Sequence, residues 1–122
     1  MSKKILLVDD DSGMHVIVVP ILSKAGYTAI SAKSGEQALH LALNERPDLI
    51  LMDVIMPGIK GRDLCKKIKA YDVLNDIPVI FLTAKDSEDD VKAEMEVGAV
   101  AHLTKPVNPA DLLNTIEEII GK

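Results

Sequence analysis

The sequence is poor in aromatic residues, has a single cysteine and has no long hydrophobic run. Aromatic side chains make up 2% of the 122 residues, so a site that stacks bases or sugars on rings has little material. Cys65 stands alone, which excludes an intrachain disulfide and favours a reducing compartment. The apolar runs fall far short of the roughly 20 residues that a membrane span needs, and no signal-peptide core follows the first residues. We therefore expect a cytoplasmic protein that does not bind membranes.

An excess of positive charge is also missing. The net charge is -5, which would repel a nucleic-acid backbone rather than release its counterions, so we expect no direct nucleic-acid binding. Hydrophobic residues, in contrast, make up 48% of the chain and charged residues 27%, as in soluble globular proteins. A chain of this length buries a core without disulfides or metals. We therefore predict one domain over residues 1–122.

Short apolar runs alternate with segments of helical periodicity along the whole chain. The runs are Ile5–Val8, Thr28–Ala32, Leu49–Met52, Val79–Leu82 and a weaker His102–Thr104. Three of them are apolar at consecutive positions, which is typical of strands that are covered on both faces. Five repeats of strand and helix predict an α/β fold, a doubly wound three-layer sandwich in which helices cover both faces of a five-stranded parallel sheet.

The segments between the runs carry signals for helix ends. Ser34 and Gln37 form a capping box for the second helix, and Asn108 begins the fifth. The fourth helix is expected to begin at Ser87 and to end at Gly98. Pro20 lies inside the first helical segment, where it removes a backbone hydrogen bond, so a kink is predicted there.

Polar side chains directly follow four of the five runs. They are Asp9, Asp10, Asp53, Thr83 and Lys105. The carboxyl ends of parallel strands meet at one edge of the sheet, where ligands bind in such folds. Each residue alone is common in caps and solvated loops, but clustered carboxylates raise one another's pKa and destabilise a fold unless a cation compensates. Together the five residues predict a site.

The donor atoms of this predicted site favour magnesium. Carboxylates and a backbone carbonyl offer too few oxygens for calcium, and no cluster of histidine or cysteine is present for zinc. Mg2+ completes its shell with waters and a phosphate oxygen, and Mn2+ is a possible substitute. A carboxylate beside the metal can attack phosphorus and form an acyl phosphate, while Lys105 neutralises charge. Asp53, which leaves a buried strand, is the predicted nucleophile, and the adjacent Asp9 and Asp10 suit metal capture.

Four segments together resemble the response-regulator receiver family, over the whole chain. They are Ile5–Asp10 (ILLVDD), Pro47–Gly58 (PDLILMDVIMPG), Pro78–Ala84 (PVIFLTA) and Gly98–Pro106 (GAVAHLTKP). The resemblance implies a flavodoxin-like (CheY-like) fold with strand order 2-1-3-4-5. It also implies two-component or phosphorelay signalling, in which a sensor histidine kinase or a histidine phosphotransfer protein donates a phosphoryl group from a phosphohistidine. The phosphorylated receiver then controls a downstream protein or a fused output domain.

The resemblance also assigns a role to each site residue. Phosphorylation falls on Asp53, and the implied metal ligands are Asp9, Asp10, Asp53 and the carbonyl of Ile55. Lys105 contacts the phosphoryl group, and the hydroxyl of Thr83 moves toward it. The implied catalytic residues are therefore Asp53, Thr83 and Lys105.

His102 occupies the switch position of the family, which is usually aromatic. A switching role and an ordinary, partly exposed histidine stay equally open; some phosphorelay receivers, including the sporulation type, also have histidine there. Val100 and Ala101 stand where family members that dimerise through the fourth and fifth helices often have acidic residues. We therefore expect a monomer or a weak dimer.

Three other functions compete with this interpretation. A magnesium-dependent phosphatase of the haloacid dehalogenase type needs a second aspartate two positions after the nucleophile as general acid, and Ile55 occupies that position. A flavodoxin-like flavin module needs a phosphate loop after the first strand, which the carboxylates of Asp9–Asp11 would disfavour. An inert pseudo-receiver would lack one of the five key residues. We therefore expect a signalling domain that catalyses only its own phosphotransfer and dephosphorylation, and no enzyme for outside substrates.

Two lesser features complete the sequence analysis. The apolar side chain of Ile55 is expected to shield an acyl phosphate from water, so self-hydrolysis should be slow. Basic residues gather around the third helix, and we interpret them as a solvated face rather than a docking patch. They are Lys60, Arg62, Lys66, Lys67 and Lys69.

Overall fold

A computed structural model describes residues 2–54, 56, 58–84, 92–93 and 95–121. Its strands are β1 Lys4–Val8, β2 Thr28–Ala32, β3 Leu49–Asp53, β4 Val79–Thr83 and β5 Ala101–Thr104. They form one sheet in the order β2-β1-β3-β4-β5, and every neighbouring pair is parallel. The predicted parallel sheet and the strand order implied by the resemblance are both confirmed.

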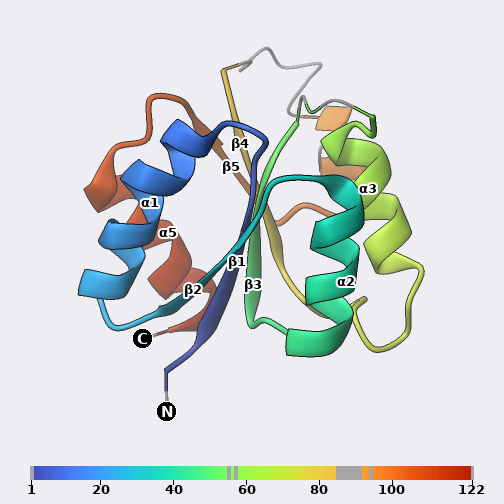
Figure 1. Cartoon of the computed structure of the whole chain (residues 1–122), viewed down its shortest axis with the longest axis horizontal. Coiled ribbons are helices and arrows are strands. Elements are labelled where there is room, and N and C mark those ends of the chain that lie inside the picture. The colour runs from blue at the N-terminus through green and yellow to red at the C-terminus, as the bar shows by residue number, and fades with distance from the viewer. Residues whose placement is uncertain (1, 55, 57, 85–91, 94, 122) are drawn as a thin grey trace.

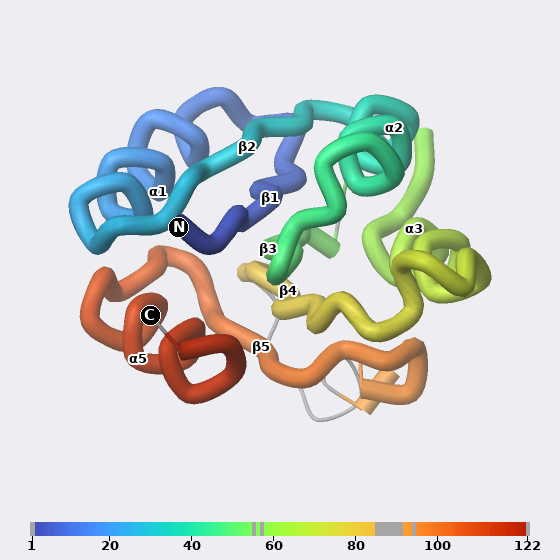
Figure 2. Tube along the Cα trace, turned by 90° about the horizontal axis from the view of Figure 1, so that it is seen from below, coloured from blue at the N-terminus to red at the C-terminus, as the bar shows by residue number. Residues whose placement is uncertain are grey.

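Helices cover both faces of this sheet. They are α1 Ser12–Lys24, α2 Gly35–Glu45, α3 Gly61–Lys69 and α5 Pro109–Ile120. Figure 1 shows α1 and α5 on one side of the sheet and α2 and α3 on the other, and Figure 2 shows the same three layers from a perpendicular direction. The described part of the predicted fourth helix, residues 92–93 and 95–96, is helical, whereas its expected start at Ser87 lies outside the described residues. None of the described helices has the length and apolarity that a membrane span requires.

The core consists of two layers, one on each side of the sheet, because successive side chains of a strand point to opposite faces. Leu6 and Ile50 pack toward α2 and α3, and Leu7 and Leu51 pack toward α1 and α5. All four are fully buried, and burying a side chain of this kind contributes roughly 1.5–3 kcal/mol. The consecutive apolar positions in the sequence therefore reflect a sheet without a wet face, as predicted.

The predicted helix caps at Ser34 and Asn108 are present, and one hydrogen bond of the first cap is shifted by one residue. The hydroxyl of Ser34 accepts a hydrogen bond from the backbone N–H of Gln37 at 3.1 Å. The side-chain oxygen of Gln37 accepts from the N–H of Lys33 at 2.8 Å, one residue earlier than in an ordinary capping box. At the start of α5, the side chain of Asn108 accepts from the N–H of Asp111 at 3.1 Å.

Pro20 lies inside α1, and the helix continues past it to Lys24. Proline removes a hydrogen bond to the preceding turn and crowds the carbonyl of residue i-4, here Val16. We expect Pro20→Ala to raise the free energy of unfolding by about 1–2 kcal/mol, after allowing for the freer unfolded chain. Urea denaturation measures this change. Pro109→Ala is the matched control, because Pro109 occupies the first turn of α5, where no intrahelical bond is missing. Equal effects of the two substitutions would contradict the prediction.

Candidate functional site

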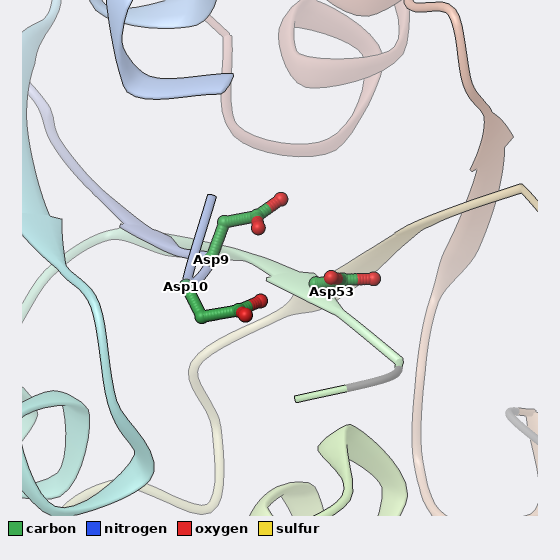
Figure 3. Close-up of side chains that lie close together, drawn as sticks. All are labelled: Asp9, Asp10 and Asp53. Carbon is green, nitrogen blue, oxygen red and sulfur yellow. The ribbon is translucent and has the colours of Figure 1, made fainter. Parts of the chain in front are cut away.

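The carboxylates of Asp9, Asp10 and Asp53 meet where two neighbouring strands end. Asp9 and Asp10 follow β1, and Asp53 is the last residue of β3. The two strands are parallel neighbours with Val8 opposite Met52, so Asp9 comes level with Asp53. One oxygen from each of the three carboxylates lies within 4.8 Å of the others, as Figure 3 illustrates. The predicted convergence of the acidic residues is thus found in the structure.

Asp9, directly after β1, is fully buried. Its N–H donates to the carbonyl of Ala32 at 3.1 Å, and its own carbonyl lies 2.8 Å from Nε2 of His15. Its Oδ1 accepts from the N–H of Asp11 at 2.9 Å, and its Oδ2 accepts from Nζ of Lys105 at 2.9 Å. Every polar atom of Asp9 therefore has a partner, so its carboxylate has a fixed direction.

Lys105 provides the positive charge between the acidic groups. Its Nζ lies 2.9 Å from Oδ2 of Asp9 and 3.5 Å from Oδ2 of Asp53. Burial acts to lower the pKa of Lys105, but the hydrogen bond to Asp9 and the charge of Asp53 outweigh burial, so the pKa is raised above its ordinary value of 10.5. A cation whose pKa rises on folding stabilises the fold fully below its ordinary pKa, and this contribution is lost as the pH rises through the folded-state value. Lys105 is therefore charged at neutral pH.

The main chain fixes where Lys105 enters the site. Its N–H donates to the carbonyl of Thr83 at 2.8 Å, which ties the end of β5 to the end of β4. The peptide bond between Lys105 and Pro106 is cis. Because β4 lies between β3 and β5 in the sheet, Lys105 reaches the carboxylates from the end of β5, across the end of β4.

Thr83 lies at the same edge as Asp53. Leu82 is opposite Asp53 in the pairing of β3 with β4, and Thr83 is the next residue, 2% exposed. His102 lies farther down β5, opposite Phe81, and is partly exposed. Ile55, whose carbonyl is the remaining implied metal ligand, lies outside the described residues.

The three carboxylates fit a hard divalent cation. Oxygen ligands of this kind suit magnesium, which needs few protein ligands because it retains waters, and three carboxylates fall short of the six to eight oxygens that calcium takes. Within the part of the chain that the structure describes, this acidic group is the one cluster of potential metal ligands, and it contains neither histidine nor cysteine. The geometry therefore agrees with the donor set expected from the sequence.

Two contacts at the site were not predicted from the sequence. One is the hydrogen bond from His15, which is 7% exposed on α1, to the carbonyl of Asp9. The other involves Gly61, where a Cβ atom would come 2.1 Å from the carbonyl oxygen of Asp53 and 2.9 Å from Cα of Val54. A histidine in an apolar stripe and a glycine at a helix start are both common, so the sequence holds no signal that marks either residue.

The fold and the acidic cluster at the edge of the sheet define the class of protein. The family model for the response regulator receiver domain matches residues 5–117, and the chain belongs to this family. It is 38% identical over 122 residues to the alkaline phosphatase synthesis transcriptional regulatory protein PhoP of Bacillus subtilis, covering 100% of this chain and 50% of PhoP. It is 34% identical over 120 residues to sporulation initiation phosphotransferase F of the same organism, covering 98% of this chain and 95% of that protein.

Solved structures agree with this assignment. The chemotaxis protein CheY4 of Vibrio cholerae superposes with a TM-score of 0.93 at 33% identity, covering 98% of this chain and 99% of CheY4. The receiver domain of a sensor histidine kinase from Pseudomonas aeruginosa superposes with a TM-score of 0.91 at 30% identity, and both chains are covered completely. That receiver has a magnesium ion coordinated in its active-site cleft.

These comparisons bear on function as well as on fold. The chain is a receiver domain of the two-component response regulators, a signalling domain of the CheY-like fold. The alternative phosphatase of the haloacid dehalogenase type finds no support among the relatives. The chain covers 50% of PhoP and 53% of the phosphate regulon transcriptional regulatory protein PhoB of Pseudomonas aeruginosa, to which it is 36% identical. It thus spans about half the length of these curated relatives.

Proposed function

We propose that this receiver accepts a phosphoryl group on Asp53, from a phosphohistidine donor and in a magnesium-dependent reaction, and switches conformation as a result. The observation that carries the proposal is the meeting of three carboxylates and one ammonium group at a single edge of the sheet. Asp9 and Asp10 are neighbours in the sequence, but Asp53 and Lys105 lie far from them along the chain. The fold therefore holds three negative charges and one positive charge at close range. Three carboxylates beside one ammonium group leave an excess of negative charge, which is unfavourable without a further cation, and a metal with a phosphoryl group gives the arrangement a use.

Asp53 is the nucleophile in this proposal. Its side chain is 12% exposed at the end of β3, where an approaching donor meets it. An oxygen of the carboxylate attacks phosphorus, the bond between phosphorus and the donor imidazole nitrogen breaks, and the electron pair returns to that imidazole. The product is an acyl phosphate on Asp53 and a dephosphorylated donor. Lys105, which already lies 3.5 Å from Asp53, neutralises charge that develops on the phosphoryl oxygens.

Asp9, Asp10 and Asp53 would hold the metal, with the carbonyl of Ile55 as the ligand that the family implies. A bound magnesium ion would neutralise the charge shared by the carboxylates and the transferred group. Mn2+ has similar ligand preferences, and we propose that it substitutes. Asp9 orients the site because all of its polar atoms are engaged.

The proposed switch starts at Thr83 and reaches His102. A phosphoryl group adds nearly two negative charges and three acceptor oxygens, and each charge-assisted hydrogen bond is worth roughly 1.5–3 kcal/mol. Two or three such bonds, from Thr83, Lys105 and backbone amides, approach the roughly 5.5 kcal/mol that turns a 1:99 equilibrium into 99:1. Phosphorylation of Asp53 therefore supplies nearly enough free energy for a complete switch.

The proposed partners are those that the receiver family implies. We propose a sensor histidine kinase or a histidine phosphotransfer protein as donor, and a downstream protein or a fused output domain as target. In this proposal, residues 1–122 form one domain that catalyses only its own phosphotransfer and dephosphorylation. The domain acts in the cytoplasm as a monomer or weak dimer and does not bind membranes. Its net charge of -5 argues against direct nucleic-acid binding by this domain, whatever an attached output domain does.

The experiment is incubation with magnesium and acetyl phosphate, followed by intact mass measurement. The protein should gain one phosphoryl group when magnesium is present and none when EDTA removes it. Asp53→Asn should gain none under either condition, whereas Asp63→Asn, a matched control on the exposed face of α3, should behave as the parent. A parent protein that stays unmodified would overturn the proposal.

Ile55 leads to a prediction about the lifetime of the phosphorylated state. An apolar side chain two positions after the phosphorylated aspartate should keep water from the acyl phosphate, so Ile55→Asn is expected to lose its phosphoryl group severalfold faster than the parent, because an amide can hydrogen-bond an attacking water. The decay of the phosphorylated mass after removal of the phosphodonor measures both rates. Ile59→Asn, a few positions further along the chain, should leave the rate near that of the parent. Equal decay for Ile55→Asn and the parent would refute the shielding role.

A further inference from the structure

We propose that His15 is a positioning residue for the metal site, because its imidazole fixes the peptide group that joins Asp9 to Asp10. This inference rests on the proposed function, since it concerns the same acidic cluster. It adds a residue from α1, a helix that contributes no residue to the site predicted from the sequence. The role is indirect: His15 acts on the backbone of the cluster and touches none of the three carboxylates in the described contacts.

The hydrogen bond to Asp9 determines which nitrogen of the ring acts as a donor. Nε2 of His15 lies 2.8 Å from the carbonyl oxygen of Asp9. A carbonyl oxygen only accepts hydrogen bonds, so Nε2 carries the proton and donates it. In the neutral ring, Nδ1 is then left with a lone pair. The bond joins residues six positions apart and connects the first turn of α1 back to the end of β1.

The rest of the imidazole lies on a buried, largely apolar face of α1, which is unfavourable for a polar ring. His15 shares the buried face of α1 with Met14, Val18 and Leu22, and within the described residues its Nδ1 is buried without a hydrogen-bond partner. An unpaired polar atom in such a place costs free energy. An aliphatic side chain would avoid that cost but would lose the donor to Asp9. The hydrogen bond is therefore the one favourable polar contact that the structure gives this histidine.

The bonded carbonyl controls the direction of Asp10. The carbonyl of Asp9 and the N–H of Asp10 belong to one planar peptide group, so fixing the oxygen fixes the plane from which Asp10 extends. Asp10 is exposed, and the described contacts include no hydrogen bond to its carboxylate. Its direction therefore depends on the backbone. At other metal sites, loss of a group that orients a metal ligand without touching the metal lowers metal affinity about 10–100-fold.

The test compares replacements that keep or remove the donor. His15→Gln retains an N–H near the position of Nε2, whereas His15→Leu and His15→Met have a similar size and donate nothing. Magnesium affinity is measured by following the amide resonances of Asp10 and Asp11 during titration with magnesium chloride, and thermal denaturation without metal verifies the fold. His40→Leu is the matched control, since His40 is exposed on α2 and bonds only Asn44 among the described contacts.

We expect both apolar variants to bind magnesium about tenfold more weakly than the parent, with His15→Gln and His40→Leu within about twofold of it. Parent affinity in a folded His15→Leu or His15→Met would overturn the role of His15 while leaving the proposed function intact. If the protein folds only with glutamine or histidine at position 15, the residue serves stability alone, and this result would also overturn the proposed positioning role. A parent that binds no magnesium would overturn both proposals.

Discussion

Replacing Lys105 by methionine is expected to slow phosphorylation of Asp53 about a hundredfold and to lower the free energy of unfolding by about 2 kcal/mol. The first effect follows because one preorganised donor to a developing oxyanion is typically worth that much in rate. The second follows because Asp9 is fully buried and would lose its charged partner at 2.9 Å. Breaking a buried ion pair leaves an uncompensated charge, although the lysine side chain is 21% exposed, which moderates the cost.

Time courses with acetyl phosphate measure the rate, and urea denaturation measures stability. Lys67→Met is the control, because Lys67 is exposed on α3, and it should change neither quantity appreciably. Magnesium offers a second comparison, since a divalent cation at the carboxylates should restore part of the stability that Lys105→Met loses. A variant that phosphorylates at the parent rate would exclude Lys105 from the transfer step.

Replacing Gly61 by alanine is expected to lower the free energy of unfolding by about 2–3 kcal/mol, near the upper end for overpacking by a single methyl group. A Cβ atom at this position would lie 2.1 Å from the carbonyl oxygen of Asp53 and 2.9 Å from Cα of Val54. Both contacts are with backbone, which cannot rotate away as a side chain does. The N–H of Gly61 also donates to the carbonyl of Val54 at 2.8 Å, so relief of the clash would stretch this bond.

Gly26→Ala separates the clash from the ordinary cost of losing a glycine. Gly26 has a φ of 97°, which disfavours alanine, but nothing lies within 4 Å of the added Cβ. We expect Gly26→Ala to cost about 1 kcal/mol and to leave phosphorylation unchanged. Gly61→Ala should also slow phosphorylation, because Asp53 moves with its backbone. Equal stability losses for the two substitutions would contradict the prediction, because they would show that the backbone between β3 and α3 moves to relieve the clash at little cost.

Much of the site was predictable from the sequence because strands impose simple geometry. Once the apolar runs are assigned to parallel strands, the residues at their ends must meet at one edge, and Asp9, Asp53 and Thr83 do so. The strands extend slightly farther than the apolar runs, since Asp53 and Thr83 are their last residues. Periodicity alone did not give the strand order, because alternating strands and helices are compatible with several orders. The resemblance to the receiver family supplied it.

The supporting contacts could not be predicted in the same way. His15 and Gly61 act through atoms of Asp9 and Asp53 that are brought to them by tertiary packing, and neither belongs to a local motif. The same holds for Lys33, whose N–H takes the place of that of Ser34 in bonding Gln37. A capping pattern predicts that a helix begins, whereas the backbone angles around it decide which N–H the side chain reaches.

Chemical mapping of the phosphorylated residue tests the central claim most directly. Borohydride reduces an aspartyl phosphate to homoserine, so the protein is phosphorylated with acetyl phosphate and magnesium, reduced, digested and sequenced by mass spectrometry. Homoserine at position 53, with Asp9 and Asp10 unchanged, is the predicted result. Homoserine at position 9 or 10, or at none of the three, would contradict the assignment of Asp53 as the phosphoryl acceptor.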